Sequence, residues 1–181
     1  LRILGVTATP KRTDGDGLRR VFERVAFKAT IKEGISKYKA LSPFVALGVQ
    51  LPVDISQIEM RGDDYDPEQL GTVLDADNVL ELVFETWHKH AGDRPTMVFT
   101  ASVAQARHLA QFFQSRDVAT AWASGETPKP ERAQIIGDFL DGRLQVIVNC
   151  ALWTEGFDAP RTACVAMVRP TRSDTVYLQA V

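Results

Sequence analysis

Short apolar runs alternate with longer amphipathic stretches along the second half of the chain. The runs cover residues 96–100, 118–123, 145–149 and 163–168. Apolar runs of this length predict strands buried on both faces of a sheet. The stretches at 103–113 and 128–140 carry apolar residues at helical spacing and predict amphipathic helices. Strands that alternate with helices predict an α/β fold, with a parallel sheet, helices on both faces and right-handed crossovers.

The first half of the chain has weaker patterns. Strands are expected at residues 1–6, 27–30 and 53–60, and helices at residues 18–25 and 31–38. Residues 41–53 are expected to be extended. Residues 61–78 hold five aspartates whose spacing matches no calcium loop, so a solvated linker is expected there. A helix follows, with a buried stripe that runs from Val79 to Trp87.

Polar residues follow the ends of the predicted strands. In an open α/β sheet, ligands bind outside the carboxyl ends of the strands. Thr100, Ser124 and Thr154 lie there and offer hydroxyls suited to phosphate contacts that carry no sequence information. Gly156 would let the backbone approach a ligand closely, and Asp158 is an acceptor suited to ribose hydroxyls.

Composition and charge limit the classes of protein to which the chain can belong. A chain of 181 residues can form one well-buried domain and part of a second. Its net charge of −2 argues against dense phosphate neutralisation by lysine and arginine, though not against contacts from backbone amides. No apolar run reaches the roughly 20 residues that span a bilayer, so we expect no membrane partner and a cytoplasmic protein. Cys150 and Cys164 are expected to be buried thiols, with no redox or metal role.

Residues 149–160, NCALWTEGFDAP, resemble motif V of the superfamily 2 helicases, in which Thr, Glu-Gly, Asp and Pro follow a buried strand. Thr7-Ala8-Thr9, within LGVTATPKRTDGDGL, resembles motif III of the same family. Residues 97–113 stand in the place of motif IV, and residues 174–181 resemble the opening of motif VI.

A further segment resembles the part of the family that touches the nucleic-acid backbone between motifs IV and V. It consists of Ser124-Gly125 followed by Arg132 and Phe139. Lys129 stands where the subfamily with the Asp-Glu-Ala-Asp box has glutamine, so the chain departs from that subfamily here.

The resemblance implies a RecA-like, P-loop NTPase-like helicase C-terminal domain. Residues 1–40 would then be the tail of a first RecA-like lobe and the crossover, and residues 41–181 a second lobe that stops within motif VI, so we expect a fragment of a longer protein. Thr7, Ala8 and Thr9 would couple the lobes. The residues implied at the nucleotide are Glu155, Gly156, Asp158 and Gln179, and those implied at the nucleic acid are Thr100, Ser124, Gly125 and Thr154.

The implied function is that of the C-terminal lobe of an ATP-dependent helicase or translocase. The intact protein would use ATP and Mg²⁺ and, with the first lobe of the same parent chain, move along nucleic acid. DNA is favoured over RNA because this form of motif V resembles the DNA-acting branches of the family. The fragment itself would hold no metal site and need no cofactor.

Two other functions compete with this one. The parent could be a duplex DNA translocase of a restriction or repair enzyme, which moves without separating strands. Alternatively, the chain could be a non-catalytic α/β module that binds a nucleotide or a partner protein. Four motif-like segments in family order weigh against the second alternative.

We predict that the isolated chain does not hydrolyse ATP. Hydrolysis needs a phosphate cradle, a held Mg²⁺ and transition-state arginines. The sequence contains no G-x-x-x-x-G-K-[ST] loop and no adjacent Asp-Glu pair, and it stops before the arginines of motif VI, so no catalytic residue is assigned. Phosphate release by the pure chain would contradict this prediction.

Overall fold

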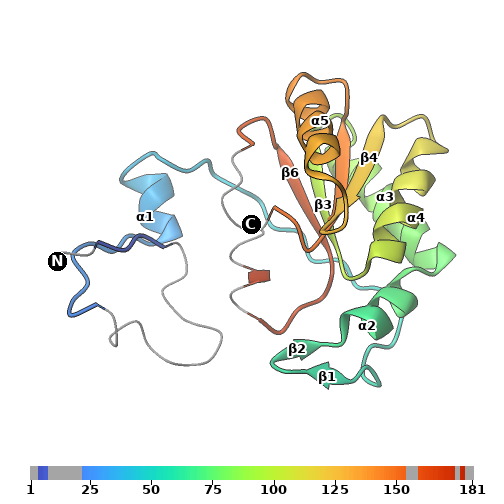
Figure 1. Cartoon of the computed structure of the whole chain (residues 1–181), viewed down its shortest axis with the longest axis horizontal. Helices are drawn as coiled ribbons and strands as arrows, with labels where there is room; N and C mark the ends of the chain where they lie inside the picture. The colour runs from blue at the N-terminus through green and yellow to red at the C-terminus, as the bar shows by residue number, and fades with distance from the viewer. Residues whose placement is uncertain (1–3, 8–21, 154–158, 174–175, 178–181) are drawn as a thin grey trace. The chain divides into compact units, whose positions relative to one another are not determined.

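A computed structural model of the chain describes residues 4–7, 22–153, 159–173 and 176–177 (Figure 1). The chain divides into two compact units, Leu1–Gln50 and Leu51–Val181. The second unit contains a four-stranded sheet and the helices that pack on it.

All four strands of this sheet are parallel, as the sequence predicts. They are β3 (Thr96–Thr100), β4 (Thr120–Ser124), β5 (Val146–Cys150) and β6 (Cys164–Val168). Their order is β4-β5-β3-β6, so β3 pairs with both β5 and β6. Every residue of β3 and β5 is buried.

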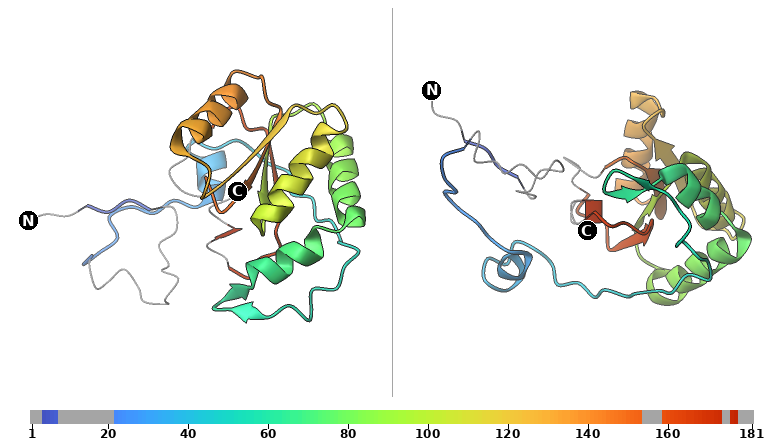
Figure 2. Two further views of the ribbon diagram at one scale, coloured as in Figure 1. Left: turned by 45° about the vertical axis from the view of Figure 1, so that its right-hand side comes forward. Right: turned by 90° about the horizontal axis from the view of Figure 1, so that it is seen from below.

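Helices cover both faces of the sheet, and this prediction is also confirmed (Figures 1 and 2). α3 (Asp77–Ala91) and α4 (Val103–Gln114) pack on the face that presents Val98 and Val148. α5 (Lys129–Leu140) packs on the opposite face. Its Ile135 and Phe139 are buried, whereas Leu140, the last residue of the helix, is 41% exposed.

The core between α3 and α4 is aromatic. Phe113 is fully buried, with its ring centroid 4.9 Å from that of Trp87 and 5.1 Å from that of Phe84. The indole of Trp87 donates a hydrogen bond of 2.8 Å to the hydroxyl of Thr96 at the start of β3. The sheet and its helices are thus joined by packing and by a satisfied buried polar contact.

Residues 53–78 differ from the prediction of an edge strand followed by a linker. They contain a hairpin of two short antiparallel strands, β1 (Met60–Arg61) and β2 (Asp64–Tyr65), and the helix α2 (Pro67–Leu74). Asp66 caps α2 through its carboxylate, and Leu70 and Leu74 are buried. Asp66 serves as a cap and Asp64 as a hydrogen-bond acceptor, roles that local composition does not distinguish from those of solvated side chains.

The first unit has one described helix, α1 (Ile31–Ser36), where a helix is predicted. Thr30 and Glu33 form a capping box at its start, with the Thr30 amide 2.8 Å from the Glu33 carboxylate. Residues 4–6, 22–25 and 27–30 were expected to be regular, but they form no helix or strand. Side chains such as Leu4 are strongly exposed, so little packing supports regular structure there.

Across the described parts of the chain, none of the helices combines the length and the apolar character needed to cross a membrane.

We predict that Phe113→Ala lowers the free energy of unfolding by about 3–5 kcal/mol, because it removes a fully buried ring and leaves a cavity. Urea unfolding followed by tryptophan fluorescence would measure the loss. Phe44→Ala is the matched control, since Phe44 is 58% exposed and its loss should change stability by less than about 0.5 kcal/mol. Equal effects of the two substitutions would contradict the assigned core.

Candidate functional site

The carboxyl ends of the four strands are level with one another. Thr100 at the end of β3 pairs with Cys150 of β5 and Val168 of β6, and Ser124 of β4 also pairs with Cys150. The topology therefore brings Thr100, Ser124 and Gly125 to one edge of the sheet, as the sequence predicts (Figure 1). Loops that follow β3, β4, β5 and β6 leave from this edge.

Thr100 stabilises the end of the sheet through its buried hydroxyl. Its side chain is buried, and the hydroxyl oxygen lies 3.0 Å from the carbonyl of Asn149 and 3.3 Å from that of Ser102. The side-chain amide of Asn149 in turn donates to the carbonyl of Val98 at 3.0 Å, and its oxygen accepts from the Leu152 amide at 3.3 Å. These contacts fix the first residues after β5. A phosphate contact by Thr100 stays a prediction.

Gln105 ties together the ends of two strands, a role that sequence analysis missed. It is fully buried in α4, where its oxygen accepts from the Ala101 amide at 2.8 Å and its nitrogen donates to the Val168 carbonyl at 3.2 Å. A glutamine inside the apolar stripe of a helix was the available signal, because buried polar groups need partners.

The turn after β4 is closed by side chains of its own residues. The Ser124 amide donates to the Thr127 hydroxyl at 2.9 Å, and the Glu126 amide donates to the Ser124 hydroxyl at 3.2 Å. Because its hydroxyl is used there, Thr127 does not cap α5, and the N-cap is Pro128, with no side-chain cap bond. Gly125 is exposed, and no atom lies within 4 Å of the position that a β-carbon would take.

A shallow groove lies beside this turn, and the charged residues that line it are acidic. It is lined by Trp122, Ser124, Glu126, Thr127, Pro128 and Glu131. The two glutamates oppose the binding of an anion inside the groove, whereas the exposed Lys129 at the start of α5 favours it nearby. The exposed backbone of Gly125 lies outside the residues that line this groove.

The backbone turns sharply after β5. Ala151 and Trp153 have φ values of 53° and 55°, in the left-handed region that costs about 1–2 kcal/mol for residues other than glycine. The residues that follow, Thr154, Glu155, Gly156 and Asp158, lie outside the described residues, as do Gln179, Ala8 and Thr9. Thr7 is described, in the first unit, and is exposed.

The two cysteines are free, and Cys150 is buried while Cys164 is half-buried. Burial raises the pKa of both thiols, so they stay protonated near neutral pH. In the described ranges, three or more His, Cys, Asp or Glu side chains nowhere gather in a way that could hold a metal ion.

Comparison with known proteins agrees with this architecture. Residues 76–181, more than half of the chain, match the family described as the helicase conserved C-terminal domain. The C-terminal domain of the DEAD-box protein Dbp5 has a similar fold, with a TM-score of 0.51 and 20% identity, over 56% of this chain and 59% of that one.

Two longer relatives match nearly the whole chain, and a third matches half of it. A 51.5 kDa protein of a Lactococcus phage is 30% identical over 97% of this chain, which spans 38% of that protein. The yeast protein named "Putative ATP-dependent helicase IRC3", from Saccharomyces cerevisiae, is 27% identical over 99% of this chain, which spans 26% of it. The ATP-dependent RNA helicase DDX4 of Mus musculus is 28% identical over 50% of this chain and 12% of its own length. The chain belongs to the helicase conserved C-terminal domain family, and its second unit has the RecA-like α/β fold of such domains.

Proposed function

We propose that the intact protein is an ATP-dependent helicase or translocase that moves along nucleic acid, with DNA as its track. The chain supplies the second lobe, and the first lobe of the same parent chain supplies the phosphate loop and the magnesium ligands. One observation carries the proposal: the motif V segment follows β5 at the level edge where three neighbouring strands also end. Ligands of open α/β sheets bind at such an edge.

The residues have distinct proposed roles. Glu155, Gly156, Asp158 and Gln179 face the nucleotide, with Asp158 nearest the ribose. Thr7, Ala8 and Thr9 couple the lobes. The residues proposed to hold the nucleic-acid backbone are Thr100, Ser124, Gly125 and Thr154. Within this last set, Gly125 is exposed while the side chains of Thr100 and Ser124 are buried, so the backbone at Gly125 is the best placed of these to meet a phosphate.

We further propose that residues 1–40 belong to the tail of the first lobe and that residues 41–181 form the second. Large apolar side chains are exposed in the first unit, including Leu4, Val6 and Phe27. Burial of such side chains is favourable, which supports a covering lobe. A cytoplasmic location remains part of the proposal.

In the proposed cycle, the two lobes close on ATP and reopen after hydrolysis. Each closure shifts the grip on the backbone of one strand, which is contacted through phosphates. RNA is the second candidate track, because an RNA helicase is among the relatives. A duplex translocase without strand separation and a non-catalytic binding module are the remaining alternatives.

ATP hydrolysis by the full-length parent tests the function. We expect turnover to be stimulated by single-stranded DNA more than by duplex DNA or RNA. Asp158→Ala should lower turnover at subsaturating ATP because a ribose hydrogen bond is lost. Greater stimulation by RNA would indicate that RNA is the track. Greater stimulation by duplex DNA would favour a duplex translocase. An absence of hydrolysis with every polymer would favour the binding module.

Gly125→Ala tests the polymer contact separately. The added methyl group meets no protein atom, but it would stand between the backbone and a phosphate. We expect the DNA concentration for half-maximal ATPase stimulation to rise about tenfold, as for a lost charge-assisted hydrogen bond of about 1.5 kcal/mol. Thermal stability should change little.

Gly137→Ala in α5 is the matched control, because its added methyl group also meets no atom within 4 Å. This substitution should leave the DNA dependence unchanged. If both variants respond to DNA as the unmodified protein does, Gly125 does not lie against the polymer.

A further inference from the structure

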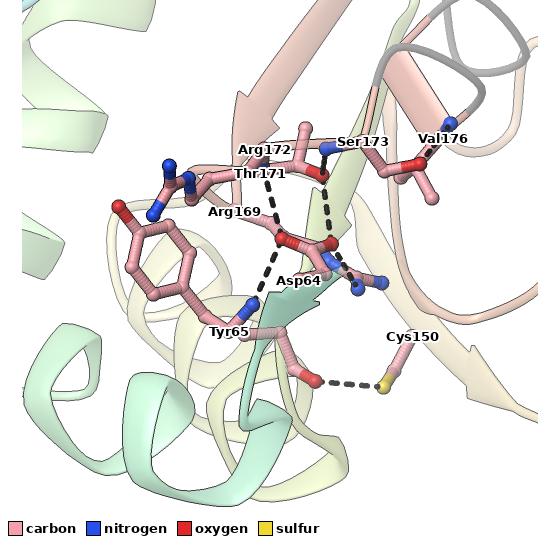
Figure 3. A network of polar contacts seen from close by, with 9 residues as sticks. Asp64, Tyr65, Cys150, Arg169, Thr171, Arg172, Ser173 and Val176 are labelled. Carbon is pink, nitrogen blue, oxygen red and sulfur yellow. Dashed lines mark hydrogen bonds and ion pairs between the residues drawn. The ribbon is translucent and has the colours of Figure 1, made fainter. Parts of the chain in front are cut away.

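Asp64, at the start of β2, accepts four hydrogen bonds (Figure 3). Its Oδ2 accepts from the Thr171 hydroxyl at 2.7 Å and from the Arg169 guanidinium at 3.2 Å. Its Oδ1 accepts from the amides of Arg172 at 3.0 Å and Tyr65 at 2.9 Å. Three of these donors belong to residues 169–172, more than a hundred residues away in sequence, in the loop that follows β6.

The carboxylate is charged and partly shielded from water. The side chains of Asp64 and Arg169 are 16% and 21% exposed. Burial by itself would raise the pKa of Asp64, but the hydrogen bonds from Arg172, Thr171 and Tyr65 and the charge of Arg169 outweigh it and lower the pKa below its ordinary value. The group is therefore ionised at neutral pH, and each of its bonds is charge-assisted.

The hairpin that carries Asp64 is attached to the helices of the second unit. The hairpin is joined to α2 through Glu59, whose amide donates to the Gln69 side chain at 3.1 Å, and the Asp66 amide donates to the Glu59 carbonyl at 2.8 Å. α2 then meets α4 closely, since a β-carbon on Gly71 would lie 2.3 Å from the Ser102 hydroxyl. Ser102 caps α4 at the edge of the sheet. These contacts connect the hairpin that carries Asp64, through α2 and α4, to the end of β3.

The hydrogen bonds continue from Asp64 toward the last described helical residues. A threonine hydroxyl has a single proton, which Thr171 donates to Asp64, while its oxygen accepts from the Ser173 amide at 3.1 Å. The Ser173 hydroxyl accepts from the Val176 amide at 3.4 Å, and its carbonyl accepts from the Tyr177 amide at 3.1 Å. Val176 and Tyr177 have helical backbone, so a series of hydrogen bonds joins Asp64 to two described helical residues.

We propose that Asp64 is a positioning residue for ATP hydrolysis, which acts through Thr171 and Ser173 to position Val176 and Tyr177 in the segment that resembles motif VI. This inference rests on the proposed function, in which that segment faces the nucleotide. Asp64 does not touch the nucleotide. It supplies a fixed charge that orients the Thr171 proton and so holds the loop after β6 in one arrangement.

Paired substitutions in the full-length parent test the proposal. Thr171→Val keeps the shape of the side chain but removes the hydroxyl, and Thr171→Ser restores the hydroxyl. Asp64→Asn removes the charge, and Asp63→Ala is the control at the neighbouring exposed aspartate. We expect kcat at saturating DNA to fall between about tenfold and about 100-fold in Thr171→Val and Asp64→Asn, because small displacements of a catalytic segment have effects of this size.

The KM for ATP and the DNA concentration for half-maximal stimulation should change much less than kcat. Thr171→Ser and Asp63→Ala should retain the kcat of the unmodified protein. The double variant Asp64→Asn/Thr171→Val should lose little more than either single variant, since both break the same connection. A merely structural anchor would lower only the folded fraction, so kcat calculated per folded molecule would equal that of the unmodified protein, and that result would overturn the proposal.

Hydrogen exchange separates this inference from the proposed function. In the unmodified protein the amides of Arg172, Ser173, Val176 and Tyr177 should be protected, and Thr171→Val should expose them while the amides of β3 stay protected. Unchanged protection would overturn the connection itself. If the parent lacks ATPase activity with every polymer but protection is lost in Thr171→Val, the proposed function and the catalytic role both fail, while the structural connection stands.

Discussion

The parallel pairing of β3 with both β5 and β6 is the constraint on which the rest of the structure depends. Because β3 is central and buried on both faces, Val98 packs toward α3 and α4 while Met97 and Phe99 pack toward α5. The register of the strand pairs aligns the carboxyl ends of β3, β5 and β6. The sheet therefore fixes where each loop at this edge begins. Hydrogen bonds within the loops then determine the direction in which each loop runs.

The sequence predicts this part of the fold well because burial on both faces leaves an unmistakable pattern. A strand such as Thr96–Thr100 cannot be solvated on either side, and helices such as Val103–Gln114 show a single apolar stripe and a serine cap. The hairpin and α2 were missed, although Asp66 before Pro67 and the i, i+4 pair Leu70 and Leu74 were usable signals. The aspartates around them favoured a linker instead.

The candidate site was likewise predicted from the sequence only in part. The topology rule places Thr100 and Ser124 at the correct edge, but it does not give the direction of their side chains. That direction depends on the carbonyls of Asn149 and Ser102 for Thr100 and on the Glu126 amide for Ser124. Asp64 could not be found from local periodicity, since its partner Thr171 is 107 residues away. Such contacts follow from the assembled fold, and no window of sequence contains both partners.

The two loops that matter most for the proposed chemistry are anchored by different means. Asn149 holds the start of the loop after β5 by neutral hydrogen bonds within the sheet edge, whereas Asp64 holds the loop after β6 by a charged group from outside the sheet. In the proposed cycle the lobe binds nucleotide and polymer in turn, and separate anchors on one rigid edge suit two loops that would meet different ligands.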